Sequence, residues 1–169
     1  VTLARFLRAV FLAVTLLVVS PAQATSLADA FLAIFPHLGA QLSAGADAHA
    51  ADLFAHRVAV IERAAASQGV PVAVLGAVCW SETRLGAWRA YASLCGVRLD
   101  HHYIADDERS ATIAARTLAH LFAQCHTWPR AFARYRTGGA CGNAAGMGYA
   151  LRTDGTAARL RFSMTRGTR

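Results

Sequence analysis

Hydrophobic residues recur at helical spacing through most of the chain, which predicts a mainly α-helical fold. Pro36 ends or kinks the first helix-like segment, and Gly69 and Pro71 mark the end of one helix and the start of the next. Residues 86–104 lack a helical period and indicate a long loop, with which short strands are compatible. The predicted helices cover a segment that begins at residue 25, then 52–67, 72–83, 106–125 and 129–136.

The first 24 residues have the pattern of a secretory signal peptide. Two arginines precede an apolar run over 10–19, and Ala22 and Ala24 form a small-x-small cleavage site. The run is too short for an ordinary membrane span, and an uncleaved signal anchor is the alternative. We therefore expect a periplasmic or secreted protein without a stable membrane span after cleavage.

Removal of 24 residues from 169 leaves 145, which is enough for one domain with a core. A Gly-rich stretch over 137–148 precedes a short predicted helix and a basic end. The expected organisation is a signal peptide (1–24), an N-terminal helical extension (25–50), one main domain (51–150) and a basic C-terminal tail (151–169).

The formal charge of +7 falls to +5 without the leader, which carries two arginines and no acid. All 17 basic residues other than histidine are arginines, and they are scattered along the chain. A nucleic-acid partner is not predicted, because such proteins cluster basic residues and interleave them with aromatic ones. A basic exported protein instead suits an anionic polymer or surface of the cell envelope.

Four cysteines follow the leader, and an even number in an exported domain predicts two disulfides. No C-x-x-C pair is present, and the adjacent His101 and His102 would point to opposite faces of an extended segment. No metal and no other cofactor is therefore expected. The disulfide candidates are Cys79, Cys95, Cys125 and Cys141.

Glu82 ends the most apolar helix predicted after the leader, over 72–83. Loss of water and the negative end of the helix dipole both disfavour an ionised carboxylate there. A protonated carboxylic acid near neutral pH is what general-acid cleavage of a glycosidic bond needs. A solvated helix-end carboxylate paired with Arg84 or Arg98 is the other interpretation.

Four motifs follow one another between Asp52 and Gly142: Gly-Val-Pro at 69–71, Trp-Ser-Glu-Thr-Arg at 80–84, Ser-Leu-Cys-Gly-Val-Arg at 93–98, and Ala-Arg-Tyr-Arg-Thr-Gly at 133–138. In this order the chain resembles the soluble lytic transglycosylase domain of the lysozyme-like superfamily. The resemblance implies a lysozyme-like helical domain whose long loop borders an active-site cleft.

Several positions depart from the family pattern. Thr83 stands in place of a serine, Val97-Arg98 in place of Leu-Met, and Leu99 in place of a glutamine. Arg136 replaces the asparagine of the family's Ala-Tyr-Asn-Ala-Gly motif. These departures concern the fit of the substrate more than the fold.

The resemblance implies cleavage of the β-1,4 bond between N-acetylmuramic acid and N-acetylglucosamine in peptidoglycan glycan strands. Glu82 would act first as acid and then as base, closing a 1,6-anhydro ring without water, and Tyr135 would place its hydroxyl beside Glu82. A half-buried core tyrosine is the plainer interpretation of Tyr135. The expected substrate-binding residues are Ser93, Gly96, Arg98, Gly138 and, for stacking on a sugar, Trp88.

Two other functions remain open at this point. A hydrolytic muramidase would use Glu82 together with Asp100, and a lysozyme-like module without activity would only bind peptidoglycan or an envelope partner. Small members of the family often open the wall for a secretion or conjugation apparatus, which makes such an apparatus a candidate partner.

The cysteine pairing also has alternatives. Cys79 precedes Glu82 by three residues, Cys125 ends an apolar helical stripe, and the resemblance puts Cys95 and Cys141 in loops beside the cleft. We favour pairing 79–125 with 95–141, although pairing 79–95 with 125–141 is equally allowed.

Overall fold

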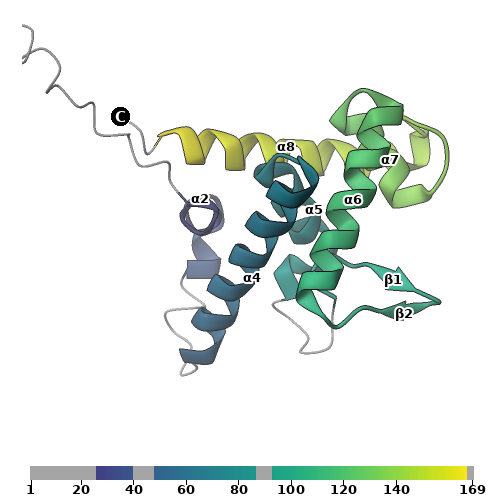
Figure 1. Ribbon diagram of the computed structural model, residues 1–169. Coiled ribbons are helices and arrows are strands. Elements are labelled where there is room, and N and C mark those ends of the chain that lie inside the picture. The colour runs from purple at the N-terminus through teal and green to yellow at the C-terminus, as the bar shows by residue number, and fades with distance from the viewer. Residues whose placement is uncertain (1–25, 40–47, 87–92, 167–169) are drawn as a thin grey trace, which may run out of the picture.

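The computed structural model describes residues 26–39, 48–86 and 93–166, and it is mainly α-helical, as the sequence predicts. No helix in these ranges is long and apolar enough to cross a membrane. Figure 1 shows the arrangement. In chain order the elements are α2 (Leu27–Ile34), α4 (Ala48–Gln68), α5 (Val72–Thr83), the 3₁₀ turn η1 (Arg84–Gly86), β1 (Arg98–Leu99), β2 (His102–Tyr103), α6 (Asp107–Cys125), α7 (Trp128–Thr137) and α8 (Ala144–Arg166).

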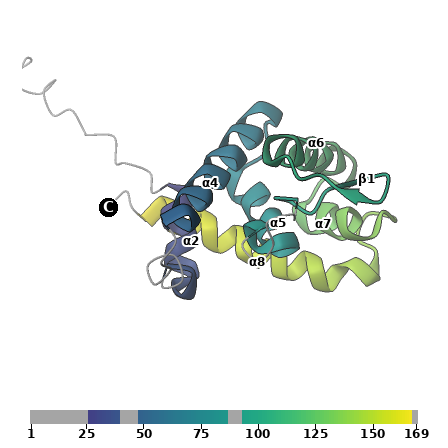
Figure 2. The same ribbon diagram turned by 90° about the horizontal axis from the view of Figure 1, so that it is seen from below.

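Helix α5 is the centre of the fold. Its residues from Ala73 to Trp80 are all buried, and α2, α4, α6 and α8 all pack against it (Figures 1 and 2). A helix that is apolar on every side must be enclosed in this way. The sequence prediction that this helix is central is therefore confirmed.

Helix α2 joins the same core rather than standing apart from it. Phe31 is fully buried, and Phe35, just after the helix, stacks on Trp80 of α5 with ring centroids 4.0 Å apart. The stacked rings fasten the N-terminal segment to the middle of the domain.

Helix α8 differs from the sequence expectation of a short helix followed by a basic tail. It runs for 23 residues past α2, α5 and α7 (Figures 1 and 2). Its buried face consists of small or hydroxyl-bearing residues and one leucine: Gly146, Ala150, Thr153, Thr156, Ala157 and Leu160. Such a face has little hydrophobic contrast, so the helical period is weak in the sequence.

The long predicted loop contains a minimal antiparallel hairpin. Arg98 pairs with Tyr103 and Leu99 with His102. Asp100 and His101 between them both have positive φ, 48° and 66°, which suits a two-residue turn whose twist matches the strands. The hairpin projects away from the helices (Figure 1) and forms one wall of the site described next.

A buried ion pair fixes the turn that follows α5. Arg57 of α4 is almost fully buried; its Nε lies 3.0 Å from Asp107 of α6, and its guanidinium donates to the carbonyl of Leu85 at 2.9 Å. One side chain thus ties α4, α6 and the turn after α5 together. Removing either charged partner would leave an unpaired buried charge, which is strongly destabilising.

Candidate active site

Glu82 lies in the last turn of α5, where the helix ends in a left-handed cap. Arg84 has φ 55° and ψ 41°, and its N–H donates to the carbonyls of Cys79 and Trp80. The Glu82 side chain is only 13 % exposed. One carboxylate oxygen, Oε1, is buried without a hydrogen-bond partner among the described residues, and Oε2 lies 3.3 Å from the guanidinium of Arg136.

Gly96 closes one side of the Glu82 carboxylate. A Cβ atom at residue 96 would lie 2.9 Å from the Cβ of Glu82 and 3.2 Å from its Oε2, and Gly96 has φ +71°. Both the space and the backbone conformation therefore require glycine. The predicted site residue Gly96 is thus adjacent to Glu82.

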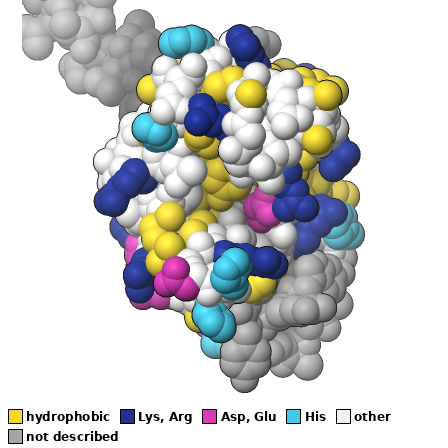
Figure 3. Space-filling model, turned by 90° about the vertical axis from the view of Figure 1, so that its right-hand side faces the viewer, with side chains coloured by type: hydrophobic (Ala, Val, Ile, Leu, Met, Phe, Trp, Pro, Cys, Tyr) yellow, Lys and Arg dark blue, Asp and Glu magenta, His cyan; other side chains and the backbone are white. Residues whose placement is uncertain are grey.

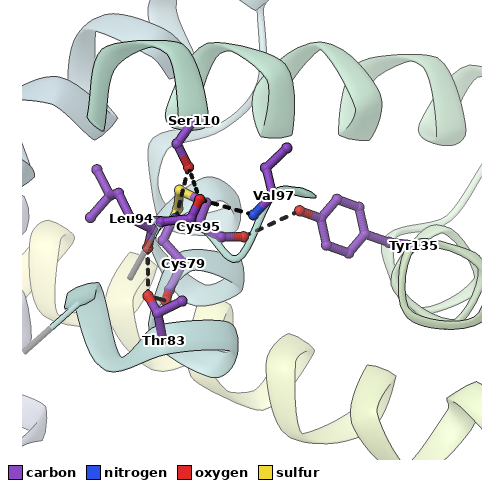
Figure 4. The surroundings of a disulfide bond; sticks show 8 residues. Cys79, Thr83, Leu94, Cys95, Val97, Ser110 and Tyr135 are labelled. Carbon is purple, nitrogen blue, oxygen red and sulfur yellow. Dashed lines mark hydrogen bonds between the residues drawn. A yellow bond between two sulfur atoms is a disulfide. The ribbon is translucent and has the colours of Figure 1, made fainter. Parts of the chain in front are cut away.

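Hydrogen bonds hold the loop that carries Gly96 (Figure 4). The Thr83 hydroxyl lies 2.6 Å from the carbonyl of Leu94. The hydroxyls of Ser93 and Ser110 are hydrogen-bonded to each other at 2.6 Å. The Ser93 hydroxyl also accepts a hydrogen bond from the N–H of Val97 at 3.0 Å, and the Ser110 hydroxyl accepts one from the N–H of Cys95 at 3.1 Å. Polar groups buried in a loop need such partners, so the network fixes the loop's shape.

Ser93 is fully buried within this network, so its hydroxyl holds the loop rather than facing a substrate. The expectation that Ser93 contacts substrate is therefore corrected. The sequence shows a serine at the right place in the loop but does not show which way its side chain points.

The disulfides join Cys79 to Cys95 and Cys125 to Cys141. The favoured pairing of 79 with 125 and 95 with 141 is therefore wrong. Cys79 faces the loop after α5, whereas Cys125, at the end of α6, meets the loop after α7. The first bridge fastens the loop after α5 to α5 itself within the main core, and the second fastens the loop after α7 to the end of α6.

Two tyrosine phenols lie near Glu82. Tyr135 of α7 points its hydroxyl at the loop and donates to the carbonyl of Cys95 at 3.5 Å (Figure 4). Burial and, second, the negative charge of Glu82 raise the pKa of Tyr135. Tyr135 therefore lies beside the carboxylate but makes its hydrogen bond to the loop backbone.

Tyr149 of α8 is a site residue that the sequence does not predict. Its ring centroid lies 5.8 Å from the guanidinium that pairs with Glu82, and burial and then the charge of Glu82 raise the pKa of Tyr149. Within the described chain, the phenol is an unpaired buried donor, and Glu82 Oε1 is an unpaired buried acceptor. Tyr149 lies four residues before Thr153, on the same side of α8. The hydrophobic pattern does not single out Tyr149, because the buried residues on that side are mostly small or hydroxyl-bearing.

Glu82 lines an open cleft of about 530 Å³, which we call the Glu82 cleft. Glu82 is the one acidic side chain among the described residues that line it; the others are Gly96, Val97, Arg98, Tyr103, Ile113, Thr117, Tyr135 and Arg136. Figure 3 shows a hollow on this side of the molecule, with acidic, basic and hydrophobic side chains gathered in it. Asp100, the candidate second acid, is exposed in the hairpin turn and does not line the cleft.

The remaining predicted site residues separate into three cases. Arg98 lines the cleft, with its guanidinium 4.2 Å from the ring centroid of Tyr103 and hydrogen-bonded to that phenol. Gly138 caps α7 with φ +68°, is exposed and lies outside the cleft lining. Trp88 falls outside the described residues.

Arg136 has a role that the sequence does not indicate. In the sequence it is only a departure from a family asparagine, yet its guanidinium pairs with Glu82 and lies 5.8 Å from the ring centroid of Tyr149. Its side chain is 58 % exposed, so the pair is open to solvent on one side and is weak.

In the part of the chain that the structure describes, no three His, Cys, Asp or Glu side chains come together in a way that could hold a metal ion. Comparisons with protein-family models, with curated proteins and with solved structures find no match to this chain.

Proposed function

We propose that this protein is a peptidoglycan lytic transglycosylase with a lysozyme-like fold, in which Glu82 acts alone as general acid and then as general base. One observation carries the proposal: a nearly buried carboxylate lies in an open cleft, next to two phenols, with no other acidic residue in the described lining. The order of motifs that resembles the soluble lytic transglycosylases adds the substrate, which is the glycan strand.

The reaction needs one group that gives a proton and later takes one. Protonated Glu82 donates its proton to the glycosidic oxygen, and the bond between that oxygen and C1 of N-acetylmuramic acid breaks. The resulting carboxylate accepts the proton of the C6 hydroxyl of the same sugar, and the C6 oxygen bonds to C1. Water is not consumed, and Glu82 ends in its starting state.

The two phenols suit this cycle as neutral donors. Because burial and the charge of Glu82 raise the pKa of both Tyr135 and Tyr149, both keep their protons at neutral pH. A phenol that stays protonated donates to a carboxylate without competing for its proton. Tyr149, whose hydroxyl has no hydrogen-bond partner in the described part of the chain, is the better placed donor.

A hydrolase that uses two carboxylates receives less support. In inverting and retaining glycosidases, two carboxyl groups of the enzyme flank the scissile bond, about 5–9.5 Å apart. Asp100 is exposed in the hairpin turn and does not line the Glu82 cleft. A one-carboxylate reaction therefore suits the arrangement better.

A module that binds peptidoglycan without cutting it is the second candidate, and the ion pair between Arg136 and Glu82 favours it. The guanidinium lies 3.3 Å from the carboxylate that would have to carry a proton. The exposure of Arg136 means that a bound glycan strand can displace it, which is why cleavage remains our first proposal.

Two disulfides are compatible with an oxidising compartment, in keeping with the proposed periplasmic or secreted location. The proposed partner is the glycan strand. A secretion or conjugation apparatus is the further partner that the family resemblance suggests.

Mass spectrometry of digested cell-wall sacculi tests the function. We expect 1,6-anhydro muropeptides from the wild type and from Asp100→Asn, and a fall of about 10²–10⁴-fold in their rate of release with Glu82→Gln. Reducing-end products that disappear in both variants indicate the muramidase instead. Binding to sacculi without any products indicates the non-cleaving module.

A further inference from the structure

A second cavity, of about 540 Å³, lies between the end of α5, the residue after α2 and the middle of α8. We call it the arginine pocket. Its described lining consists of Phe35, Trp80, Ser81, Arg84, Tyr149, Leu151, Arg152, Thr153, Gly155, Thr156 and Arg159. Apart from Tyr149, its lining residues have no role in the proposed cleavage.

The pocket is positively charged and has an aromatic side. Three arginines and no acidic residue line its described part. The Arg84 guanidinium lies 5.2 Å from the ring centroid of Trp80, and that of Arg159 lies 5.8 Å from the ring centroid of Phe35. The ion pairs found among the described residues, Arg57–Asp107, Arg63–Glu108 and Arg136–Glu82, involve other arginines. The donors of the pocket therefore lack a carboxylate from the described chain.

The left-handed cap of α5 fixes the backbone at Arg84. Arg84 and the next residue, Leu85, both lie in the left-handed region, at φ 55° and φ 57°. Glycine adopts this conformation without strain, whereas an arginine is strained there. The cap turns the chain at the end of α5, and the Arg84 guanidinium lies beside Trp80 in the pocket.

The arginine pocket borders the Glu82 cleft at Tyr149. Tyr149 lines the pocket, and its ring centroid lies 5.8 Å from the guanidinium of Arg136, which lines the Glu82 cleft. Ser81, which also lines the pocket, directly precedes Glu82 and accepts a hydrogen bond from Thr153 at 3.1 Å. The arginine pocket and the Glu82 cleft are therefore neighbouring sites, joined through Tyr149 and Arg136.

We propose that the arginine pocket binds the carboxylates of the peptide attached to the glycan strand, a step that rests on the proposed function. Guanidinium groups match carboxylates in a two-bond fork, and the three that line the pocket have no acidic residue beside them in its described lining. The pocket then selects peptide-bearing glycan over bare glycan.

Binding measurements on the Glu82→Gln protein test the proposal without turnover. The probes are a disaccharide tetrapeptide from peptidoglycan, the same compound with its carboxylates amidated, and a peptide-free N-acetylglucosamine oligosaccharide. We expect Arg152→Gln with Arg159→Gln to weaken tetrapeptide binding at least about tenfold, since bonds to charged groups are the strong ones. Binding of the amidated compound and of the oligosaccharide should not change.

A matched control removes the same charge elsewhere on α8. Arg161 and Arg166 are exposed and do not line the pocket, so Arg161→Gln with Arg166→Gln should leave tetrapeptide binding unchanged. Equal weakening in both double variants overturns the proposal, because it shows a general charge effect. Circular dichroism of each variant confirms that it is folded, and Arg84→Gln gives a second, independent test of the pocket.

The outcome is separable from the cleavage result. Specific loss of tetrapeptide binding supports the pocket even if the wild type releases no anhydro products. Cleavage with tetrapeptide affinity unchanged by Arg152→Gln and Arg159→Gln overturns the pocket and leaves the enzyme proposal standing. Binding to anionic phospholipid vesicles that these substitutions abolish, with tetrapeptide binding intact, also overturns it and assigns the arginines to a membrane surface.

Discussion

Gly96 approaches Glu82 so closely that a Cβ atom on residue 96 would stand 2.9 Å from the Cβ of Glu82. The loop that carries Gly96 is fastened to the end of α5 by the Thr83 hydroxyl and by the disulfide between Cys79 and Cys95. The position of the carboxylate and the shape of the loop therefore depend on each other.

Gly96→Ala should impair both folding and cleavage. The left-handed backbone, at φ +71°, and the collision with Glu82 together should cost about 2–4 kcal/mol in the free energy of unfolding. Gly69→Ala is the matched control, because Gly69 has φ +64° and a Cβ atom at that residue would meet nothing within 4 Å. Only about 1–2 kcal/mol should be lost there, with cleavage unchanged. Urea denaturation and anhydro-product release measure both effects. Equal losses in the two variants would show that contact with Glu82 is unimportant.

The sequence is most informative where burial is complete. Helix α5 is apolar on every side, so its central position follows directly, and Glu82 at its end stands out for the same reason. The resemblance to lytic transglycosylases then brings in Gly96 and Tyr135, both of which line the cleft with Glu82.

The features that the sequence does not reveal depend on long-range packing. Tyr149 lies near Glu82 because α8 packs against α5 and α7, and the small residues on the buried face of α8 give that helix a weak hydrophobic pattern. The disulfide partners cannot be chosen by counting, since three pairings are possible for four cysteines. The burial of Ser93 likewise depends on Ser110, which lies on another element.

Stability should fall in alkaline solution because of Tyr135 and Tyr149. Burial and then the charge of Glu82 raise the pKa of both phenols in the folded protein above the ordinary value of about 10. Above about pH 10 the unfolded chain loses protons that the folded protein keeps, so the free energy of unfolding decreases by up to about 1.4 kcal/mol per pH unit for each phenol. Below that pH the two phenols add no pH dependence.

Urea denaturation at about pH 8 and about pH 11 measures this slope. Tyr149→Phe should make the alkaline loss smaller at little cost at neutral pH, because its hydroxyl has no hydrogen-bond partner among the described residues to lose. Tyr135→Phe should also reduce the slope but should cost about 1 kcal/mol at neutral pH through loss of the bond to Cys95. An unchanged slope in the double variant would contradict the assignment.

Gly146→Ala should separate α8 from α7. A Cβ atom at residue 146 would lie 2.4 Å from the carbonyl oxygen of Ala133, and the backbone there cannot give way as a flexible side chain can. We expect a loss of about 1–3 kcal/mol in the free energy of unfolding. Gly155→Ala on the same helix meets nothing within 4 Å and should stabilise by about 0.5–1 kcal/mol through helix propensity. Destabilisation by both substitutions would argue against this close contact.

The two disulfides should have similar effects on stability and different effects on cleavage. Each closes a loop with a sequence separation of 16, so removal of either should cost about 3 kcal/mol on chain-entropy grounds. Cys79→Ala with Cys95→Ala also frees the loop that faces Glu82, and cleavage should fall well below that of the folded wild type. Cys125→Ala with Cys141→Ala should lower the melting temperature by a similar amount and keep cleavage at temperatures where the variant is folded. If both double variants cleave equally well, the loop does not need its bridge to place Gly96 against the carboxylate.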